Sequence, residues 1–218
     1  MKGYYFITDE TLSAAGIMSD ARAALGAGVR MVQYRNKTAP TRVLYDEARI
    51  LAGICAVHGA RLIINDRIDI ALAAGADGVH IGQEDMPYPA ARKLLGSGRI
   101  IGVTVHGLEE AVEAEAAGAD YLGVSPIFAT GTKGDAGEPC GTSTLAEIRR
   151  VVGIPIAAIG GIALGNADAV IAAGADMVCA ISAVVSSPDV AAEVRRFQEK
   201  FRLVEGVPAG SGNGEVVT

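Results

Sequence analysis

The stretch Ala73-Ala74-Gly75-Ala76-Asp77 precedes the apolar run Gly78-Val79-His80-Ile81, and the same phrase recurs twice more along the chain. The other copies lie at 116–120 and 172–176, and apolar runs follow them at 121–124 and 177–181. An alanine-rich helix commonly ends in glycine, which adopts a left-handed backbone without steric cost. Strands that are covered on both faces are continuous apolar runs. The phrase therefore predicts a repeated unit of helix, short turn and buried strand.

Further units extend this pattern over most of the chain. A weaker copy of the phrase at 25–29 precedes the apolar run 31–34, and more strands are expected at 3–8, 61–65, 99–105 and 154–160. Helical patterns separate the strands, at 20–25, 42–58, 68–74, 88–95, 108–117, 144–152, 166–173 and 190–201. Regular alternation predicts parallel strands. Eight such units favour a single-domain α/β fold, the (β/α)8 TIM barrel, over an open doubly wound sheet.

The length of the chain agrees with one barrel domain. Its 218 residues are close to the roughly 250 that are typical of this fold. We assign residues 1–205 to the barrel. Residues 206–218 are rich in Gly, Pro, Ser and Asn and have no apolar periodicity, so we expect a disordered C-terminal tail.

Composition excludes several classes of protein. The net charge of −6 argues against a nucleic-acid binder that uses a broad basic face. No apolar run approaches the roughly 20 residues of a membrane span, and the N-terminus lacks the apolar core of a signal peptide. Three widely spaced cysteines, Cys55, Cys140 and Cys179, argue against a disulfide framework or a zinc site. We expect a soluble, cytoplasmic protein.

Polar residues cluster where the predicted strands end. In a barrel of this kind the active site lies at the carboxyl ends of the strands. The polar or glycine-rich strand ends are 33–37, 65–67, 83–85, 104–106, 125–133, 160–161 and 181–182. Because these segments are distant in sequence but share one rim of the barrel, they predict a single site.

The strand end at 33–37 carries an amide and two cations at alternate positions, Gln33, Arg35 and Lys37. Alternate residues of a strand point to the same face. Arginine can bind a phosphate with two parallel hydrogen bonds, and lysine supplies a mobile point charge. The pattern is typical of a polyphosphate site, and the alternative is an ordinary charged strand end in solvent.

Asp66 and Asp85 are candidate magnesium ligands, because Mg²⁺ is usually held by one or two carboxylates together with substrate phosphate oxygens. The alternative for both is to cap the helices expected at 68–74 and 88–95. Glu84 could take the place of Asp85.

The loop at 130–137, Thr-Gly-Thr-Lys-Gly-Asp-Ala-Gly, combines glycines, hydroxyls and one lysine. Backbone N–H groups in such a loop can surround an anion. The loop does not match the phosphate-binding consensus of nucleotide triphosphatases. The strand ends 160–161 and 181–182 stand where such barrels often bind phosphate. The alternatives are a surface loop and a tight turn.

Two histidines fall near these strand ends. His80 lies inside a predicted strand, which favours a core or pore-facing role, whereas His106 follows a strand and could contact a substrate. The sequence contains no legible Ser-His-Asp or Cys-His set.

These motifs, in this order, resemble the thiamine-phosphate synthase family. The matching segments cover nearly the whole chain except the tail. They are 4–9, 33–37, 64–69, 78–85, 102–106, 130–136 and 158–162.

The resemblance implies a transferase that joins 4-amino-2-methyl-5-hydroxymethylpyrimidine diphosphate to thiazole phosphate and releases pyrophosphate. The thiazole substrate is 4-methyl-5-(2-phosphoethyl)thiazole or its carboxylated form. The implied pyrimidine diphosphate site comprises Gln33, Tyr34, Arg35, Asn36, Lys37, Asn65, Thr104 and Lys133. The implied thiazole phosphate site comprises Thr130, Gly131, Thr132, Gly161, Ile181 and Ser182. Mg²⁺ would be bound by Asp66 and Asp85.

Two positions depart from the family pattern. Thr104 stands where serine is usual and keeps the hydroxyl, and Ala129 replaces a usual proline. The family is understood to react dissociatively, which requires neutralisation of the leaving group more than a strong base. The resemblance therefore assigns catalytic roles to Arg35, Lys37 and Lys133.

Two alternatives to this function stay open at the level of sequence. One is the related thiazole tautomerase of the same fold, which would use a histidine at the position of His106. The other is a non-catalytic regulator that binds thiamine precursors. For partners we expect small-molecule phosphates, no nucleic acid and no membrane, and the sequence is compatible with a homo-oligomer.

Overall fold

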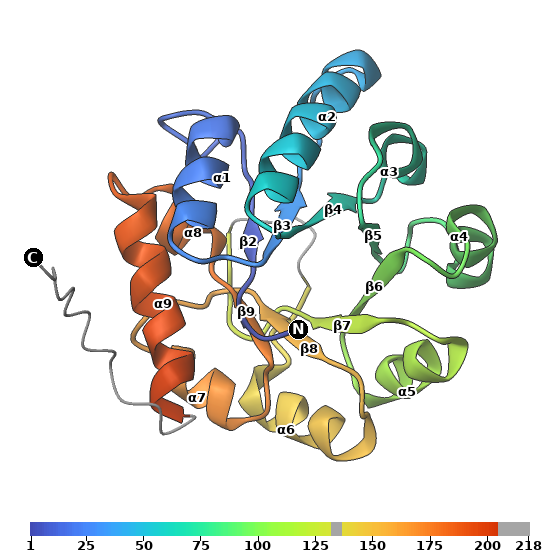
Figure 1. Ribbon diagram of the computed structural model, residues 1–218. Helices are drawn as coiled ribbons and strands as arrows, with labels where there is room; N and C mark the ends of the chain where they lie inside the picture. The colour runs from blue at the N-terminus through green and yellow to red at the C-terminus, as the bar shows by residue number, and fades with distance from the viewer. Residues whose placement is uncertain (132–136, 205–218) are drawn as a thin grey trace, which may run out of the picture.

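A computed structural model describes residues 1–131 and 137–204 as a ring of parallel strands surrounded by helices (Figure 1). The strands are β1 Gly3–Tyr4, β2 Phe6–Ile7, β3 Met31–Tyr34, β4 Arg61–Asn65, β5 Gly78–Ile81, β6 Ile100–Val105, β7 Tyr121–Val124, β8 Ile156–Ile159 and β9 Met177–Cys179. Every neighbouring pair is parallel, in the order β1-β9-β8-β7-β6-β5-β4-β3-β2.

The ring closes through the N-terminal segment, because β1 and β2 are two parts of one strand that is interrupted at Tyr5. β1 pairs with β9, and β2 pairs with β3. The sheet therefore has eight strand positions and no open edge between its first and last members. This confirms the predicted TIM barrel.

The helices lie outside the ring and cover it (Figure 1). They are α1 Ile17–Gly26, α2 Thr41–Val57, α3 Ile68–Ala74, α4 Tyr88–Leu95, α5 Leu108–Ala117, α6 Gly141–Val151, α7 Ala167–Ala172, α8 Ile181–Val185 and α9 Val190–Val204. In α2 the buried residues Leu44, Ala48, Leu51 and Cys55 recur at helical spacing, so one face packs on the barrel.

One element differs from the prediction. The strand expected at 177–181 ends at Cys179, and Ile181 and Ser182 instead begin the short helix α8. The segment is rich in β-branched residues, which favours a strand on propensity alone. Its buried residues Ile181, Val184 and Val185 have helical spacing, so tertiary packing decides the conformation.

The repeated phrase has two structural roles. Gly75 and Gly118 end their helices with left-handed backbones, as expected. The aspartate that closes each phrase donates its N–H to a residue of the preceding strand and accepts that same residue's N–H on its carboxylate. The pairs are Asp77 with Leu62, Asp120 with Ile101 and Asp176 with Ile156, at 2.8–2.9 Å. We call these contacts the aspartate clamps.

In the part of the chain that the structure describes, no helix is long and apolar enough to cross a membrane. The predicted tail at 206–218 lies outside the described residues, so its disorder stays a prediction.

Candidate active site

A polar cavity of about 300 Å³ opens at the carboxyl ends of β3 to β7. Its lining combines cations, carboxylates, amides and hydroxyls from five strand ends. The lining residues are Arg35, Lys37, Asn65, Asp66, His80, Gly82, Gln83, Glu84, Asp85, Thr104, His106 and Ser125. We call it the large cavity.

A second, smaller and less polar cavity adjoins it and shares Ser125 as a wall. This small cavity lies at the ends of β7, β8 and β9 and at the start of α8. Its remaining lining residues are Pro126, Thr130, Ile159, Gly160, Gly161, Ile162, Cys179, Ala180, Ile181 and Ser182.

Arg35 is fixed at the large cavity by the end of β2. The hydroxyl of Thr8 accepts the Arg35 N–H at 2.9 Å and donates to its carbonyl at 3.1 Å. Arg35 Nη1 lies 3.1 Å from the buried Asp9 carboxylate, whose other oxygen accepts the N–H groups of Thr11 and Leu12. Arg35 Nε is buried and has no hydrogen-bond partner among the described residues. The ion pair with Asp9 and the two bonds to Thr8 thus hold Arg35 in place at the wall of the large cavity.

Thr8 and Asp9 were not predicted as site residues. Both belong to the segment 4–9 that matches the family pattern, and both follow directly on the first strand. Their position at a strand end was the signal that could have identified them, because the other strand ends were read in this way.

Of the predicted residues at 33–37, two line the large cavity. Arg35 and Lys37 line the large cavity, and Asn65 from the next strand joins them. Gln33 is buried in the barrel interior, where its amide donates to Tyr5 at 2.9 Å.

Tyr34 and Asn36 do not reach the large cavity, contrary to the predicted roles. Tyr34 points to the opposite face of β3, where its hydroxyl donates to Glu47 of α2. The oxygen of Asn36 accepts the N–H groups of Thr38 and Ala39 in the turn before α2. The reason is the two-residue period of the strand, which places odd and even positions on opposite sides.

Asp66 and Asp85 both line the large cavity, beside Glu84. Asp66 has a left-handed backbone with φ of 60°, which is rare outside glycine and is found at functional sites. Its N–H donates to the carbonyl of His80 at 2.8 Å, which ties β4 to β5 at this point. Asp85 accepts the Gly82 N–H at 2.7 Å and so is also fixed.

Helix capping does not account for these carboxylates. The residue before α3 is Arg67, the residue before α4 is Pro87, and neither helix has a side-chain cap. No cluster of three or more His, Cys, Asp or Glu side chains capable of holding a metal occurs in the described ranges. Two carboxylates beside arginine and lysine form instead the open set that suits a Mg²⁺ shared with a phosphate ligand.

The small cavity brings together four of the predicted thiazole-phosphate residues, Thr130, Gly161, Ile181 and Ser182. A Cβ at Gly161 would lie 2.6 Å from the carbonyl oxygen of Ala129, so the backbone there packs too closely for any side chain. Gly131 is described but does not line the cavity. Thr132 and Lys133 lie outside the described residues.

The two histidines at the large cavity have different surroundings. His106 is exposed, and its Nδ1 donates to the carbonyl of Ser125 at 2.6 Å. His80 is buried, with Nδ1 2.9 Å from the Tyr121 hydroxyl and Nε2 2.9 Å from the Thr104 hydroxyl. His80 therefore fulfils the predicted core role and also contributes to the cavity wall.

Comparisons with known proteins show the family to which this sequence and fold are similar. The family model described as "Thiamine monophosphate synthase" matches residues 4–184. A thiamine-phosphate synthase of Methanosarcina mazei is 49% identical over 203 residues, which cover 93% of this chain and 84% of the relative. One from Moorella thermoacetica is 51% identical over 203 residues, covering 93% and 97%. The solved thiamine phosphate pyrophosphorylase from Pyrococcus furiosus is 39% identical, with a TM-score of 0.85 and coverage of 95% and 97%.

Proposed function

The chain belongs to the thiamine monophosphate synthase family and is an enzyme of thiamine biosynthesis that forms thiamine phosphate, and we propose that its active site is the pair of adjoining cavities. The observation that carries this proposal is the convergence of Arg35, Asp66 and Asp85, from three separate strand ends, on the large cavity. In this assignment the large cavity binds the pyrimidine diphosphate, and the small cavity binds the thiazole phosphate.

The large cavity has the charges that a metal-complexed diphosphate requires. Asp66 and Asp85 would bind Mg²⁺, with Glu84 close to them in the lining. When bound, the ion would neutralise part of the negative charge that develops on the leaving pyrophosphate. Arg35 would contribute hydrogen bonds from a position that Thr8 and Asp9 hold in place, and Lys37 would add a positive charge.

The small cavity suits a single phosphate. The backbone N–H groups at the start of α8 belong to Ile181 and Ser182, and N–H groups at a helix start bind anions. Thr130 adds a hydroxyl, and Gly161 lets the backbone pack closely against Ala129. A phosphate bound here would hold the thiazole beside the large cavity, so that its nitrogen lies close to the pyrimidine carbon with which it reacts.

The family resemblance assigns three further residues to the site, Gly131, Thr132 and Lys133. Lys133 would add a third positive charge on the leaving pyrophosphate, and the two neighbours would contribute to the thiazole phosphate site. The chemistry proposed here needs no protein base of high strength, because expulsion of pyrophosphate is limited by the charge on the leaving group.

The first experiment measures pyrophosphate release from purified protein with both substrates, with and without Mg²⁺. We expect steady release that depends on both substrates and is abolished by a chelator. Release of pyrophosphate without the thiazole phosphate would contradict the proposed condensation. Tautomer conversion of the thiazole without pyrimidine diphosphate would support the tautomerase instead.

The second experiment tests the metal site by Asp66→Asn. Asparagine tolerates the left-handed backbone but removes the negative charge, so we expect a folded protein with turnover lowered by at least about 100-fold. The matched control is Asp69→Asn, three residues later, which removes a carboxylate that forms an ion pair with Arg67 at the surface. Turnover at the wild-type level in Asp66→Asn, across a Mg²⁺ titration, would rule out the assigned role.

A further inference from the structure

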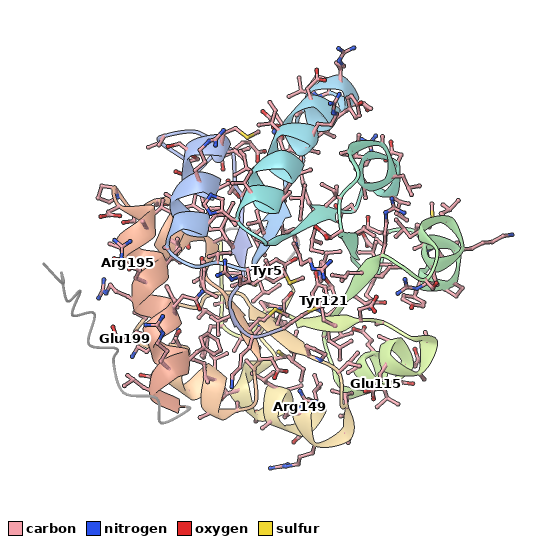
Figure 2. All side chains as sticks on the ribbon, in the orientation of Figure 1. Tyr5, Glu115, Tyr121, Arg149, Arg195 and Glu199 are labelled. Atoms are coloured by element: carbon pink, nitrogen blue, oxygen red, sulfur yellow. The ribbon has the colours of Figure 1, made fainter. Side chains whose placement is uncertain are left out.

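A chain of hydrogen bonds crosses the barrel interior from β3 to the large cavity. Gln33 Nε2 lies 2.9 Å from the Tyr5 hydroxyl, which lies 3.0 Å from the Tyr121 hydroxyl. Tyr121 in turn lies 2.9 Å from His80 Nδ1, and His80 Nε2 lies 2.9 Å from the Thr104 hydroxyl. Figure 2 labels Tyr5 and Tyr121 near the middle of the ring of strands. The chain thus links the interior to the cavity wall.

This chain of hydrogen bonds would destabilise the fold if any of its buried polar groups lacked a partner. Gln33, Tyr5, Tyr121 and His80 are each at most 3% exposed, so their polar atoms are desolvated. Buried polar groups without partners destabilise a fold, and an apolar filling of the same shape is often as stable. Phenylalanines at the two tyrosine positions would fill the core equally well, so packing alone does not explain the hydroxyls.

Two strand glycines show that the rings are accommodated specifically. A Cβ at Gly102 of β6 would lie 2.0 Å from Tyr121 Cζ, and a Cβ at Gly123 of β7 would lie 2.7 Å from His80 Cε1. Glycine is unfavourable inside strands and marks the close approach of another group. The missing side chains at Gly102 and Gly123 therefore leave the space that the Tyr121 and His80 rings occupy.

Proton counting gives the chain a direction. Burial raises the pKa of Tyr5 and of Tyr121 far above the ordinary value, so both keep their single proton. Gln33 donates its amide N–H to Tyr5, whereas the distances alone leave the donor open in the other two bonds. If each buried hydroxyl proton is to have an acceptor within the chain, Tyr5 donates to Tyr121 and Tyr121 donates to His80 Nδ1. A neutral imidazole that accepts at Nδ1 carries its proton on Nε2. His80 then donates to Thr104, whose own proton is left for another acceptor.

We propose, on the basis of the proposed function, that Tyr121 and Tyr5 are positioning residues that act through His80 to direct the Thr104 hydroxyl proton into the large cavity, where it donates to an acceptor atom of the bound pyrimidine diphosphate. The substrate preference that follows is for a ligand with a lone pair, not an N–H or O–H, opposite Thr104. Neither tyrosine needs to touch the substrate for this effect.

The first test measures the His80 tautomer in the free full-length protein by ¹⁵N NMR. The chain has three histidines, and single substitutions of His58 and His106 assign the signals. We expect His80 protonated at Nε2 only, and His106, which donates from Nδ1, in the opposite form. Tyr121→Phe should abolish the single Nε2-protonated form of His80. The control Tyr4→Phe, which removes a buried hydroxyl bonded to Ala180, should leave it intact.

The second test is a double-mutant cycle on turnover. Tyr121→Phe should lower kcat/KM for the pyrimidine diphosphate by about 10-fold in the wild-type background, and by less than about 2-fold when Thr104→Val is already present. Thr104→Ser should restore the full effect of Tyr121→Phe. An equal loss in both backgrounds, or a wild-type His80 protonated at Nδ1, would overturn the proposal. Because the tautomer is read without substrates, a wild-type protein that releases no pyrophosphate would refute the proposed function separately.

Discussion

Single residues of this barrel are constrained by contacts that their own sequence neighbours do not reveal. Gly102 and Gly123 are ordinary glycines in apolar runs, yet each makes room for a polar ring from another strand, Tyr121 of β7 and His80 of β5. The pairing of β6 with β7 places Gly102 opposite Tyr121, which explains why the position tolerates no side chain. Glycine in these strands is therefore a packing requirement and not a turn signal.

Gly102→Ala should destabilise the protein strongly. Its Cβ would overlap the rigid Tyr121 ring, and overpacking of this kind costs about 1–3 kcal/mol. The control is Gly98→Ala, where no atom lies within 4 Å of the added Cβ, and there the change should stay within about 0.5 kcal/mol. Urea unfolding of both variants measures the difference. Equal stabilities would contradict the packing of Tyr121 against β6.

The thiol of Cys55 should make stability fall at alkaline pH. Burial, with a smaller effect of Asp77, raises its pKa from the ordinary 9.0 to about 12. The folded protein thus holds a proton that the unfolded chain releases above pH 9. The stabilisation is complete below that pH and is lost as the pH rises towards 12. Urea unfolding between pH 8 and 11 should show a shallower decline for Cys55→Ala than for the wild type.

At the scale of elements, the repeated sequence Ala-Ala-Gly-Ala-Asp forms part of the barrel rim at the amino ends of the strands. In each copy a glycine lies between the helix and the next strand, and the aspartate clamp attaches that strand to the one before it. An arginine pairs with each clamp carboxylate, as Arg149 does with Asp176 at 3.0 Å. This rim lies at the opposite end from both cavities, so the phrase serves stability and not catalysis.

Asp120→Ala should lower stability and leave the kinetics unchanged. The substitution leaves the N–H of the fully buried Ile101 without its acceptor and removes the partner of Arg92, a loss of about 1–3 kcal/mol. The control Asp46→Ala removes only an exposed i,i+4 pair with Arg42 and should leave the urea midpoint unchanged. A change in KM for either substrate in Asp120→Ala would argue against a purely structural rim.

For the whole molecule, the decisive feature is closure between the two ends of the chain. β1 completes the ring against β9, and α9 covers that junction (Figure 1). Gln198 of α9 accepts the Tyr4 N–H at 3.1 Å and donates to the Gly28 carbonyl at 3.2 Å. One side chain near the C-terminus thus joins the first strand to the loop before β3.

Gln198→Ala should therefore weaken the closure of the barrel. Two backbone groups lose their partners, and we expect a loss of about 1–2 kcal/mol in the free energy of unfolding. The neighbouring Glu199→Ala is the control, because Glu199 is exposed on the same helix (Figure 2). Hydrogen exchange at Tyr4 should accelerate in Gln198→Ala alone. Unchanged exchange at Tyr4 would show that the closure does not depend on this contact.

The sequence by itself determined the barrel and the rim on which the site lies. Apolar runs that alternate with helical patterns leave parallel strands as the arrangement that buries them, and residues at strand ends then share one edge. Arg35, Asp66 and Asp85 could be chosen on this basis, because their position along each strand is a local property.

Only the tertiary structure decided what depends on contacts between distant segments. It turned 181–185 into helix α8, since burial of three spaced residues outweighs β propensity. It directed Tyr34 away from the cavity, and it linked Gln33, Tyr121 and His80 into one chain of hydrogen bonds. Such pairings join residues that are far apart in sequence, and their geometry exists only once the ring has closed.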